Sequence, residues 1–246
     1  MNKKKLRFLQ GFIRESEWIE GIDRGLGEIK KELLSKQADG HVGAMFFLNW
    51  LAQKQRVLNK EYLCDVHRLI MRDRALTFEQ TGNGPSGCYR ERRVAIYQKT
   101  LMPVFLKKGK FNLIEELKLI RRAPHPKKVP KLMEEWFENV VKWQKISGNN
   151  SPKWNVRKIA DFHFDFEMIH PFGDGNGRTG RAIAYYMLKF ARLKPFIFWE
   201  YDKSKTYYPC FSDKTKMLMK EYFRIRVFEP KKIMGRVETL TEEDLI

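Results

Sequence analysis

Residues 170–181 of this chain are HPFGDGNGRTGR, and the apolar segments on either side of this stretch decide the fold. The segment FDFEMI at residues 164–169 precedes it and suits a packed helix. The run AIAYYML at residues 182–188 follows it and predicts a second helix. The stretch is therefore expected to be a glycine-rich loop that leads directly into a helix N-terminus.

Such a loop can bind phosphate for simple physical reasons. The first backbone N–H groups of a helix have no intrahelical acceptor, and the helix dipole places positive charge beside them. Glycine lets the backbone approach a ligand closely and adopt a positive φ. We therefore expect the amides of Gly175, Asn176 and Gly177 to hold phosphate oxygens.

The polar side chains of the stretch extend this interpretation. Asp174 offers a hard oxygen ligand to Mg²⁺, which usually takes one or two carboxylates plus substrate phosphates. Arg178 and Arg181 share a face of the expected helix, and their guanidinium groups match phosphate oxygens. His170 titrates near neutrality and can accept a proton from an attacking hydroxyl. The combination predicts transfer of a phosphate-containing group from a nucleotide.

Each feature also has an ordinary structural explanation. A Gly-Asn-Gly run is usually a turn, and a histidine beside apolar residues is usually a core or cap residue. A base, an acid, glycines and arginines in nearly consecutive positions are poorly explained as coincidence, so the functional interpretation is favoured.

The stretch is similar to the signature of the Fic family, His-Pro-Phe-x-Asp/Glu-Gly-Asn-Gly-Arg-x-x-Arg, at every specified position. The resemblance covers about residues 60–210, and further matching segments are Leu63–Met71, Gly87–Ile96, Pro126–Trp136 and Ala160–Ile169, which contains His163. It implies a mainly α fold: a Fic-type helical bundle with a short β-hairpin flap beside the active-site loop.

The resemblance also implies an activity. Many Fic proteins are protein adenylyltransferases, which use ATP and Mg²⁺ to place AMP on a Ser, Thr or Tyr hydroxyl of a target protein, themselves included. His170 would be the base, Asn176 would contact the α-phosphate, Arg178 would clamp the phosphates and Arg181 would bind the γ-phosphate. Phe172 is expected to anchor the loop in the core.

The segment SEWIEG at residues 16–21 is similar to the inhibitory pattern of the family, Ser/Thr-x-x-x-Glu-Gly/Asn. Ser16 and Glu20 lie four residues apart and face the same way on a helix. Glu20 is expected to pair with Arg181 and to leave a bound nucleotide misaligned for attack, while Gly21 is expected to permit close approach. The competing interpretation is an ordinary helix N-cap, since Ser followed by acidic residues is a common capping pattern.

Composition fits a cytoplasmic enzyme. The 246 residues are 43% hydrophobic and 13% aromatic, which argues against a disordered chain. Cys64, Cys88 and Cys210 lack the spacing of a zinc site or a disulfide framework, so a reducing compartment is expected. No apolar run approaches the length of a membrane span, so no membrane partner is expected.

The formal net charge of +18 is less specific. A positive field attracts nucleotides and other anions, and the basic excess is densest over residues 107–131. An ordinary solvated surface is the first interpretation, and recruitment of an acidic protein target is the second. Nucleic acid ranks last as a partner, because no helix-turn-helix, zinc finger or RNP motif accompanies the charge. Nothing in the sequence predicts the oligomeric state.

The pattern along the chain predicts an N-terminal helical region with the inhibitory motif over residues 1–58, a Fic-like catalytic core over 59–226 and a tail over 227–246. Helices are predicted at about 27–34, 43–57, 60–72, 111–121, 129–146, 154–168, 178–193 and 207–226, with a loop at 81–87. A hairpin of strands at 93–97 and 101–105 is predicted as the flap, although residues 97–125 are longer than the family pattern and leave its tip unplaced.

Three alternatives stay open. Other Fic-type enzymes transfer UMP, phosphocholine or a lone phosphate, although the intact Gly175-Asn176-Gly177 favours nucleotidyl transfer over the kinase-like branch. Removal of AMP, with Glu20 positioning a water, is another activity within the family. From another class, the chain would be a basic, nucleic-acid-associated regulatory protein.

Overall fold

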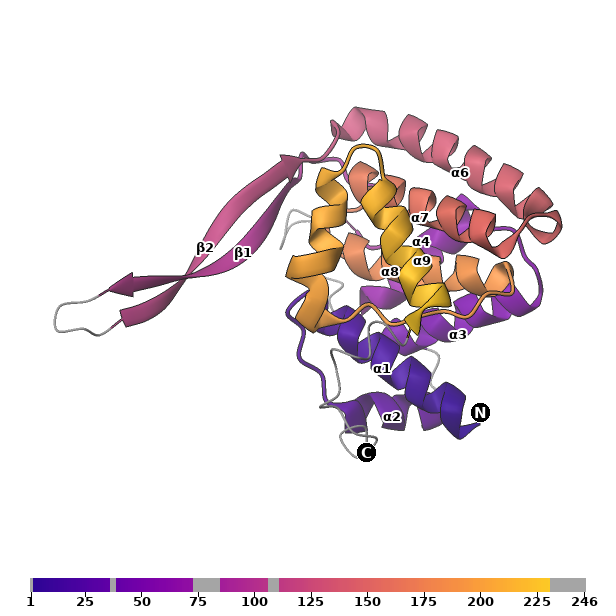
Figure 1. The fold of residues 1–246 in the computed structure, drawn as a ribbon, viewed down its shortest axis with the longest axis horizontal. Coiled ribbons are helices and arrows are strands. Elements are labelled where there is room, and N and C mark those ends of the chain that lie inside the picture. Colours follow the sequence, from indigo (N-terminus) through magenta and orange to yellow (C-terminus); the bar gives the residue numbers. More distant parts are fainter. Residues whose placement is uncertain (1, 36–38, 73–84, 106–110, 231–246) are drawn as a thin grey trace.

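The computed structural model describes residues 2–35, 39–72, 85–105 and 111–230. Its α-helices are α1 (Lys3–Ile19), α2 (Leu26–Ser35), α3 (Gly40–Gln53), α4 (Lys60–Ile70), α6 (Val129–Ile146), α7 (Pro152–Ile169), α8 (Asn176–Phe190) and α9 (Met217–Phe228). Two antiparallel strands, β1 (Ala95–Phe105) and β2 (Phe111–Arg122), project as a ribbon from the helical body (Figure 1). The predicted mainly α bundle with a hairpin is confirmed.

Helix α8 is the central element of the body. It packs against α1, α3, α4 and α7, and nearly all of its side chains are buried. A helix that is apolar on most of its sides must lie inside the core, which explains the run of apolar residues after the loop. Helix α7 packs on α8, while α6 and α9 pack on α7, so both helices that flank the glycine-rich stretch are fixed by their neighbours.

The N-terminal helix α1 is part of the same core. Leu9, Phe12 and Ile13 are completely or almost completely buried, and the Phe12 ring lies 5.5 Å from that of Tyr185 in α8. The predicted N-terminal region and the predicted catalytic core therefore share one hydrophobic cluster. This packing fixes the C-terminal end of α1 near the first turn of α8.

The hairpin differs from the prediction. The segments 93–97 and 101–105 were predicted to pair with each other, but both belong to the single strand β1. Only residues 93 and 94 lie outside it, directly before its first residue. The partner of β1 is β2, whose sequence was predicted as a helix at 111–121; it pairs from Ala95↔Arg122 to Phe105↔Phe111. Apolar residues in β2 fit both periodicities, and pairing with β1 satisfies the backbone groups that the two strands turn toward each other. The sequence left the flap tip unplaced within residues 97–125, and residues 106–110, which follow β1 and precede β2, lie outside the described residues.

Other boundaries shift less. The predicted helix at 207–226 begins only with α9, because Glu200–Asp202, Lys203–Tyr207 and Tyr208–Ser212 form short 3-10 and π turns. Most of the loop predicted at 81–87 and of the tail predicted at 227–246 lies outside the described residues.

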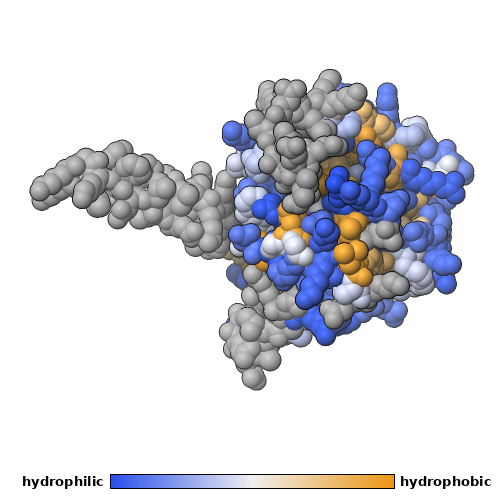
Figure 2. All heavy atoms as spheres, turned by 90° about the horizontal axis from the view of Figure 1, so that it is seen from below, coloured by the Kyte–Doolittle hydropathy of each residue, from blue (hydrophilic) through white to orange (hydrophobic). Residues whose placement is uncertain are grey.

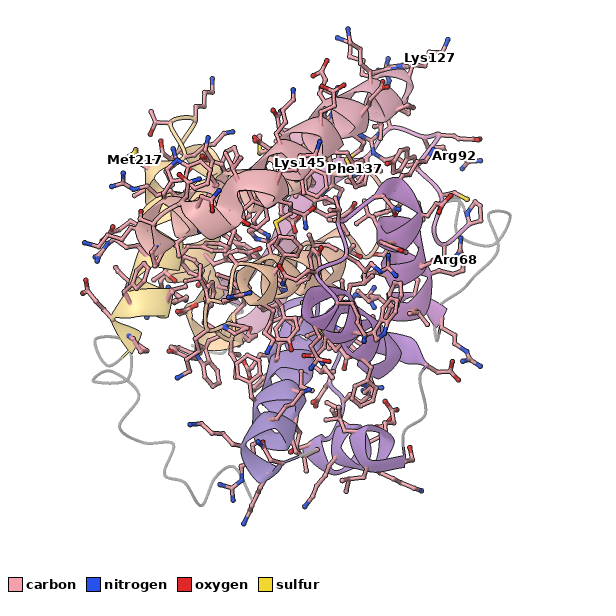
Figure 3. The ribbon with its side chains drawn as sticks, turned by 90° about the vertical axis from the view of Figure 1, so that its right-hand side faces the viewer. Arg68, Arg92, Lys127, Phe137, Lys145 and Met217 are labelled. Atoms are coloured by element: carbon pink, nitrogen blue, oxygen red, sulfur yellow. The ribbon has the colours of Figure 1, made fainter. Side chains whose placement is uncertain are left out.

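The surface of the body is largely hydrophilic on the face that Figure 2 shows, with smaller hydrophobic patches. Helix α6 lies across the outside of the body, and Lys127, in the 3-10 turn Pro126–Lys128 that precedes α6, points away from the body (Figure 3). Within the described part of the chain, no helix is long and apolar enough to cross a membrane.

The packing of α1 is testable by core truncation. Phe12→Ala leaves a cavity against α8 and is expected to lower the free energy of unfolding by about 3–5 kcal/mol, measured by urea denaturation. Leu34→Ala, at a side chain that is 58% exposed, is the control and is expected to change it by less than about 0.5 kcal/mol. Equal effects of the two changes would contradict a core role for α1.

Candidate active site

His170 ends helix α7 in the left-handed conformation, with φ 53° and ψ 62°. Its Nδ1 lies 3.3 Å from the carbonyl oxygen of Glu167. A carbonyl oxygen only accepts hydrogen bonds, so Nδ1 carries the hydrogen and Nε2 keeps its lone pair. Burial, and then the charge of Arg121, lower the pKa of His170 to about 4. The ring is therefore neutral at pH 7, as a general base must be.

Phe172 anchors the loop that follows, which confirms its predicted role. Its side chain is fully buried, and its ring stacks on the ring of His67 with centroids 3.8 Å apart. The side chain of Asn176 closes the loop: Oδ1 accepts from the Phe172 N–H at 2.9 Å, and Nδ2 donates to the Phe172 carbonyl at 2.9 Å. Asn176 thus fixes the main chain of the loop in addition to any contact with a ligand.

The N-terminus of α8 has the features of an anion site. Gly175 precedes the helix with a φ of +70°, a conformation that favours glycine. Across the described residues, no side chain caps this helix. The first backbone N–H groups of α8, beginning at Asn176 and Gly177, therefore lack both an intrahelical acceptor and a capping side chain. Successive amides at a helix start attract phosphate.

Asp174 lies beside this helix start with a side chain that is 51% exposed. Its Oδ1 accepts from the Gly175 N–H at 2.6 Å, and its Oδ2 lies 3.8 Å from the Arg178 guanidinium. Among the described residues, no group of three or more His, Cys, Asp or Glu side chains is arranged to hold a metal. A single accessible carboxylate fits Mg²⁺ that is held mainly by substrate phosphates and water.

His67 and Met71, from α4 and its C-cap, contact the loop and the first turn of α8. His67 donates through Nε2 to the Asp174 carbonyl at 2.9 Å and accepts through Nδ1 from the Gly87 N–H at 2.8 Å. The buried Arg178 guanidinium contacts the sulfur of Met71 at 3.1 Å. Sequence analysis placed His67 in a family-like segment without giving it a role, and its histidine-to-main-chain contacts carry no local sequence signal.

The structure brings Ser16 and Glu20 to Arg181. The Arg181 guanidinium, 1% exposed, donates through Nε to the Ser16 hydroxyl at 3.1 Å and through one terminal nitrogen to the Ser16 carbonyl at 2.8 Å. The same nitrogen donates to the Glu20 carboxylate at 2.7 Å. Burial alone would lower the pKa of Arg181, but the Glu20 carboxylate raises it above its usual value.

Two glycines near this ion pair have different reasons to be glycine. Gly21 was expected to permit close approach, but a Cβ at this position would meet nothing within 4 Å. Its φ of +75° at the end of α1 is what favours glycine there. Gly177 is the position of close approach, because a Cβ there would lie 2.3 Å from Oε1 of Glu20.

His163, in α7, and Tyr207 form a hydrogen-bonded pair that contacts the main chain of α8 at Gly180. His163 is buried, its Nδ1 lies 3.2 Å from the Gly180 carbonyl, and its Nε2 lies 2.8 Å from the Tyr207 hydroxyl. Burial lowers the pKa of His163 to about 3, so the ring is neutral. Because both of its ring nitrogens are engaged in these contacts, His163 has a structural role.

Comparison with known proteins gives one family match and several matches of fold. The Fic/DOC family model matches residues 57–188. A Fic domain containing signalling protein from Bacteroides thetaiotaomicron matches with a TM-score of 0.63 at 17% identity, over 91% of this chain and 85% of that protein. A Fic family protein from Desulfovibrio desulfuricans matches with a TM-score of 0.57 at 22% identity, over 97% and 68%. Fic-1 from Caenorhabditis elegans matches with a TM-score of 0.57 at 17% identity, over 97% and 65%.

The loop closure by Asn176 gives a test. Asn176→Asp replaces the donor that faces the Phe172 carbonyl with an acceptor, and it is expected to lower the free energy of unfolding by about 1–3 kcal/mol in urea denaturation. Asn139→Asp makes the same change at an exposed position of α6 and is expected to shift it by less than about 0.5 kcal/mol. An Asn176→Asp protein as stable as the control would show that these hydrogen bonds do not hold the loop.

Proposed function

Since the chain belongs to the Fic/DOC family, we propose that it is a protein adenylyltransferase, which transfers AMP from ATP to a Ser, Thr or Tyr hydroxyl of a target protein. The observation that carries the proposal is a neutral histidine with a free lone pair beside an uncapped helix N-terminus. His170 supplies the first and the start of α8 the second. A base and a phosphate cradle are what nucleotidyl transfer requires of the protein.

The cradle would hold the nucleotide by its phosphates. The amides of Asn176 and Gly177 would bind the α- and β-phosphates, and that of Gly175 would join them by exchanging its hydrogen bond to Asp174 for one to phosphate. The Arg178 guanidinium would face the same oxygens from the helix. Asp174 would hold Mg²⁺, which neutralises phosphate charge when bound. Arg181 would bind the γ-phosphate once its present partner is displaced.

The base would act on the acceptor hydroxyl of the target. Nε2 of His170 takes the hydroxyl proton as that oxygen forms a bond to the α-phosphorus, and the bond from this phosphorus to the bridging oxygen of the β-phosphate breaks. Pyrophosphate leaves and AMP stays on the target through a phosphodiester bond. The hydrogen bond from Nδ1 to Glu167 keeps the ring oriented and compensates the positive charge that the ring acquires.

The β1–β2 hairpin is the element proposed to present the target. An extended peptide can add to the edge of a strand through main-chain hydrogen bonds, with little demand on its side chains. The base of the hairpin lies close to the end of α7, since Arg121 donates to main-chain oxygens of Glu167 and Met168. A strand added there would place its hydroxyl on the side of His170.

Glu20 is proposed to inhibit the enzyme. It occupies the guanidinium that the γ-phosphate needs, which supports the inhibitory interpretation over a simple helix cap. Since α1 is anchored in the core by Leu9, Phe12 and Ile13, release is proposed to move the partly exposed Glu20 side chain and not the whole helix.

Transfer of label from ATP tests the function. Wild type, Glu20→Gly and Glu20→Gly/His170→Ala are incubated with Mg²⁺ and ATP labelled on the α-phosphate, alone or with candidate targets. Glu20→Gly is expected to label protein roughly 5- to 150-fold faster than wild type, the range of typical coupling between two sites. The double variant is expected to show no labelling above background.

Parallel arms separate the alternatives. Label carried only from the γ-phosphate would indicate phosphate transfer, and label from UTP would indicate UMP transfer. Loss of AMP from a modified target would indicate the reverse activity. No transfer in any arm, despite measurable ATP binding, would contradict the proposed function, and salt-sensitive DNA binding unaffected by His170→Ala would favour a nucleic-acid-associated protein.

A further inference from the structure

Two arginines at the base of the hairpin hold the C-terminal end of α7. The last carbonyl groups of a helix have no intrahelical donors and need partners from elsewhere. Arg121, in β2, donates to the carbonyl oxygens of Glu167 and Met168, the latter at 3.0 Å. Arg90, just before β1, donates to those of Ile169 at 3.4 Å and His170 at 2.7 Å. Four consecutive carbonyl groups are thus bound by two side chains.

Arg90 is itself fixed on all sides. Its side chain is 3% exposed and also donates to the carbonyl oxygens of Arg92 at 3.0 Å and Pro124 at 2.7 Å. Its backbone N–H donates to the Pro171 carbonyl at 2.9 Å. Arg90 therefore joins the segment before β1 and the segment after β2 to the carbonyl groups of Ile169, His170 and Pro171 at the start of the active-site turn.

These contacts act on the backbone of His170. A left-handed conformation is uncommon for a residue other than glycine and persists only where the surroundings hold it. Arg90 binds the carbonyl groups of the peptide units on both sides of this residue, those of Ile169 and His170, and also that of Pro171, which follows it. They supply the constraint that the sequence of the loop alone does not provide.

The same arginines act on the ring through their charge. The charged groups that face His170 are Arg121 of β2, Arg90 before β1 and Glu20 at the end of α1, while the Glu167 carbonyl of α7 binds Nδ1. After burial, Arg121 contributes most to the lowered pKa of His170, Arg90 contributes less, and Glu20 opposes both. Arg90 and Arg121 therefore act on His170 in two ways, through hydrogen bonds to the backbone around it and through their charge.

We infer that Arg90 and Arg121 form an arginine clamp, a pair of positioning residues that hold His170 in its left-handed conformation and keep its Nε2 ready to accept a proton. Neither residue was given a role by the sequence pattern, and neither needs to touch substrate. The catalytic consequence rests on the proposed function, in which His170 is the base, whereas the effect on the ring itself does not.

A histidine titration tests the clamp without relying on activity. The protein carries 5 histidines, so the ring signals of ¹³C-labelled histidine are resolvable by NMR, and His170→Ala assigns the one of interest. Arg121→Gln removes the charge and is expected to raise the pKa of His170, with about tenfold tighter proton binding. Arg121→Lys keeps the charge and is expected to leave the pKa close to wild type.

Arg122→Gln is the matched control, because Arg122 is the next residue of β2 and is exposed. It removes the same charge from the same strand and is expected to leave the His170 titration unchanged. A His170 pKa that stays at the wild-type value in Arg121→Gln, or that moves equally in Arg122→Gln, would overturn the clamp. Thermal unfolding confirms that each variant is folded.

Kinetics in the Glu20→Gly background extend the test. A base with a raised pKa becomes protonated at higher pH. Arg121→Gln is therefore expected to shift the acidic limb of the pH–rate profile of labelling to higher pH, by as much as the pKa of His170 rises. It is also expected to lower kcat more than it raises the KM for ATP, whereas Arg122→Gln is not. An unchanged profile in a labelling-active enzyme would overturn the positioning role. Absence of labelling in every variant would instead reject the proposed function, and the NMR titration would still decide the clamp.

Discussion

The chain must pass from the end of α7 to the start of α8 within residues 170–175, and every functional group of the site depends on how that turn is fixed. Two left-handed residues, His170 and Gly175, bend the backbone at its two ends. Between them, Phe172 is held in the core, and its main chain is bound by the Asn176 side chain. Glycine adopts a left-handed conformation without steric cost, whereas histidine does not. The conformation of His170 therefore requires support from outside the turn, and Arg90 and Arg121 at the base of the hairpin provide it.

Three histidines near the turn show how hydrogen bonding separates structural from chemical roles. Burial lowers the pKa of His67, His163 and His170 alike, so a lowered pKa does not distinguish them. Both ring nitrogens of His67 are engaged by main-chain groups, and both of His163 by a main-chain oxygen and Tyr207. In the described part of the chain, the ring of His170 is engaged only through Nδ1. Proton acceptance needs a lone pair that the fold leaves uncommitted, and this ring keeps one.

The sequence predicted those features that arise from local patterns. The helices around the turn, the core position of Phe172 and the meeting of Glu20 with Arg181 follow from periodicity and from a motif with fixed spacing. The strand β2 was missed, since its apolar spacing suits a helix as well, and only the pairing with β1 decides between them. The bonds of Arg121 to α7 were missed for the same reason, because they join segments that are distant in sequence. Roles that depend on tertiary contact leave no local signal.

The buried guanidinium of Arg181 places a thermodynamic condition on regulation. A buried cation that loses its partner is destabilised by several kcal/mol, so the fold favours states in which this charge is compensated. In the present state the Glu20 carboxylate provides the compensation, with the Ser16 oxygens as neutral partners. Under the proposed function, the γ-phosphate of ATP would replace that carboxylate as the counter-charge. The Glu20 carboxylate and the γ-phosphate would then compete for a single cation, and each would weaken the binding of the other to the same extent.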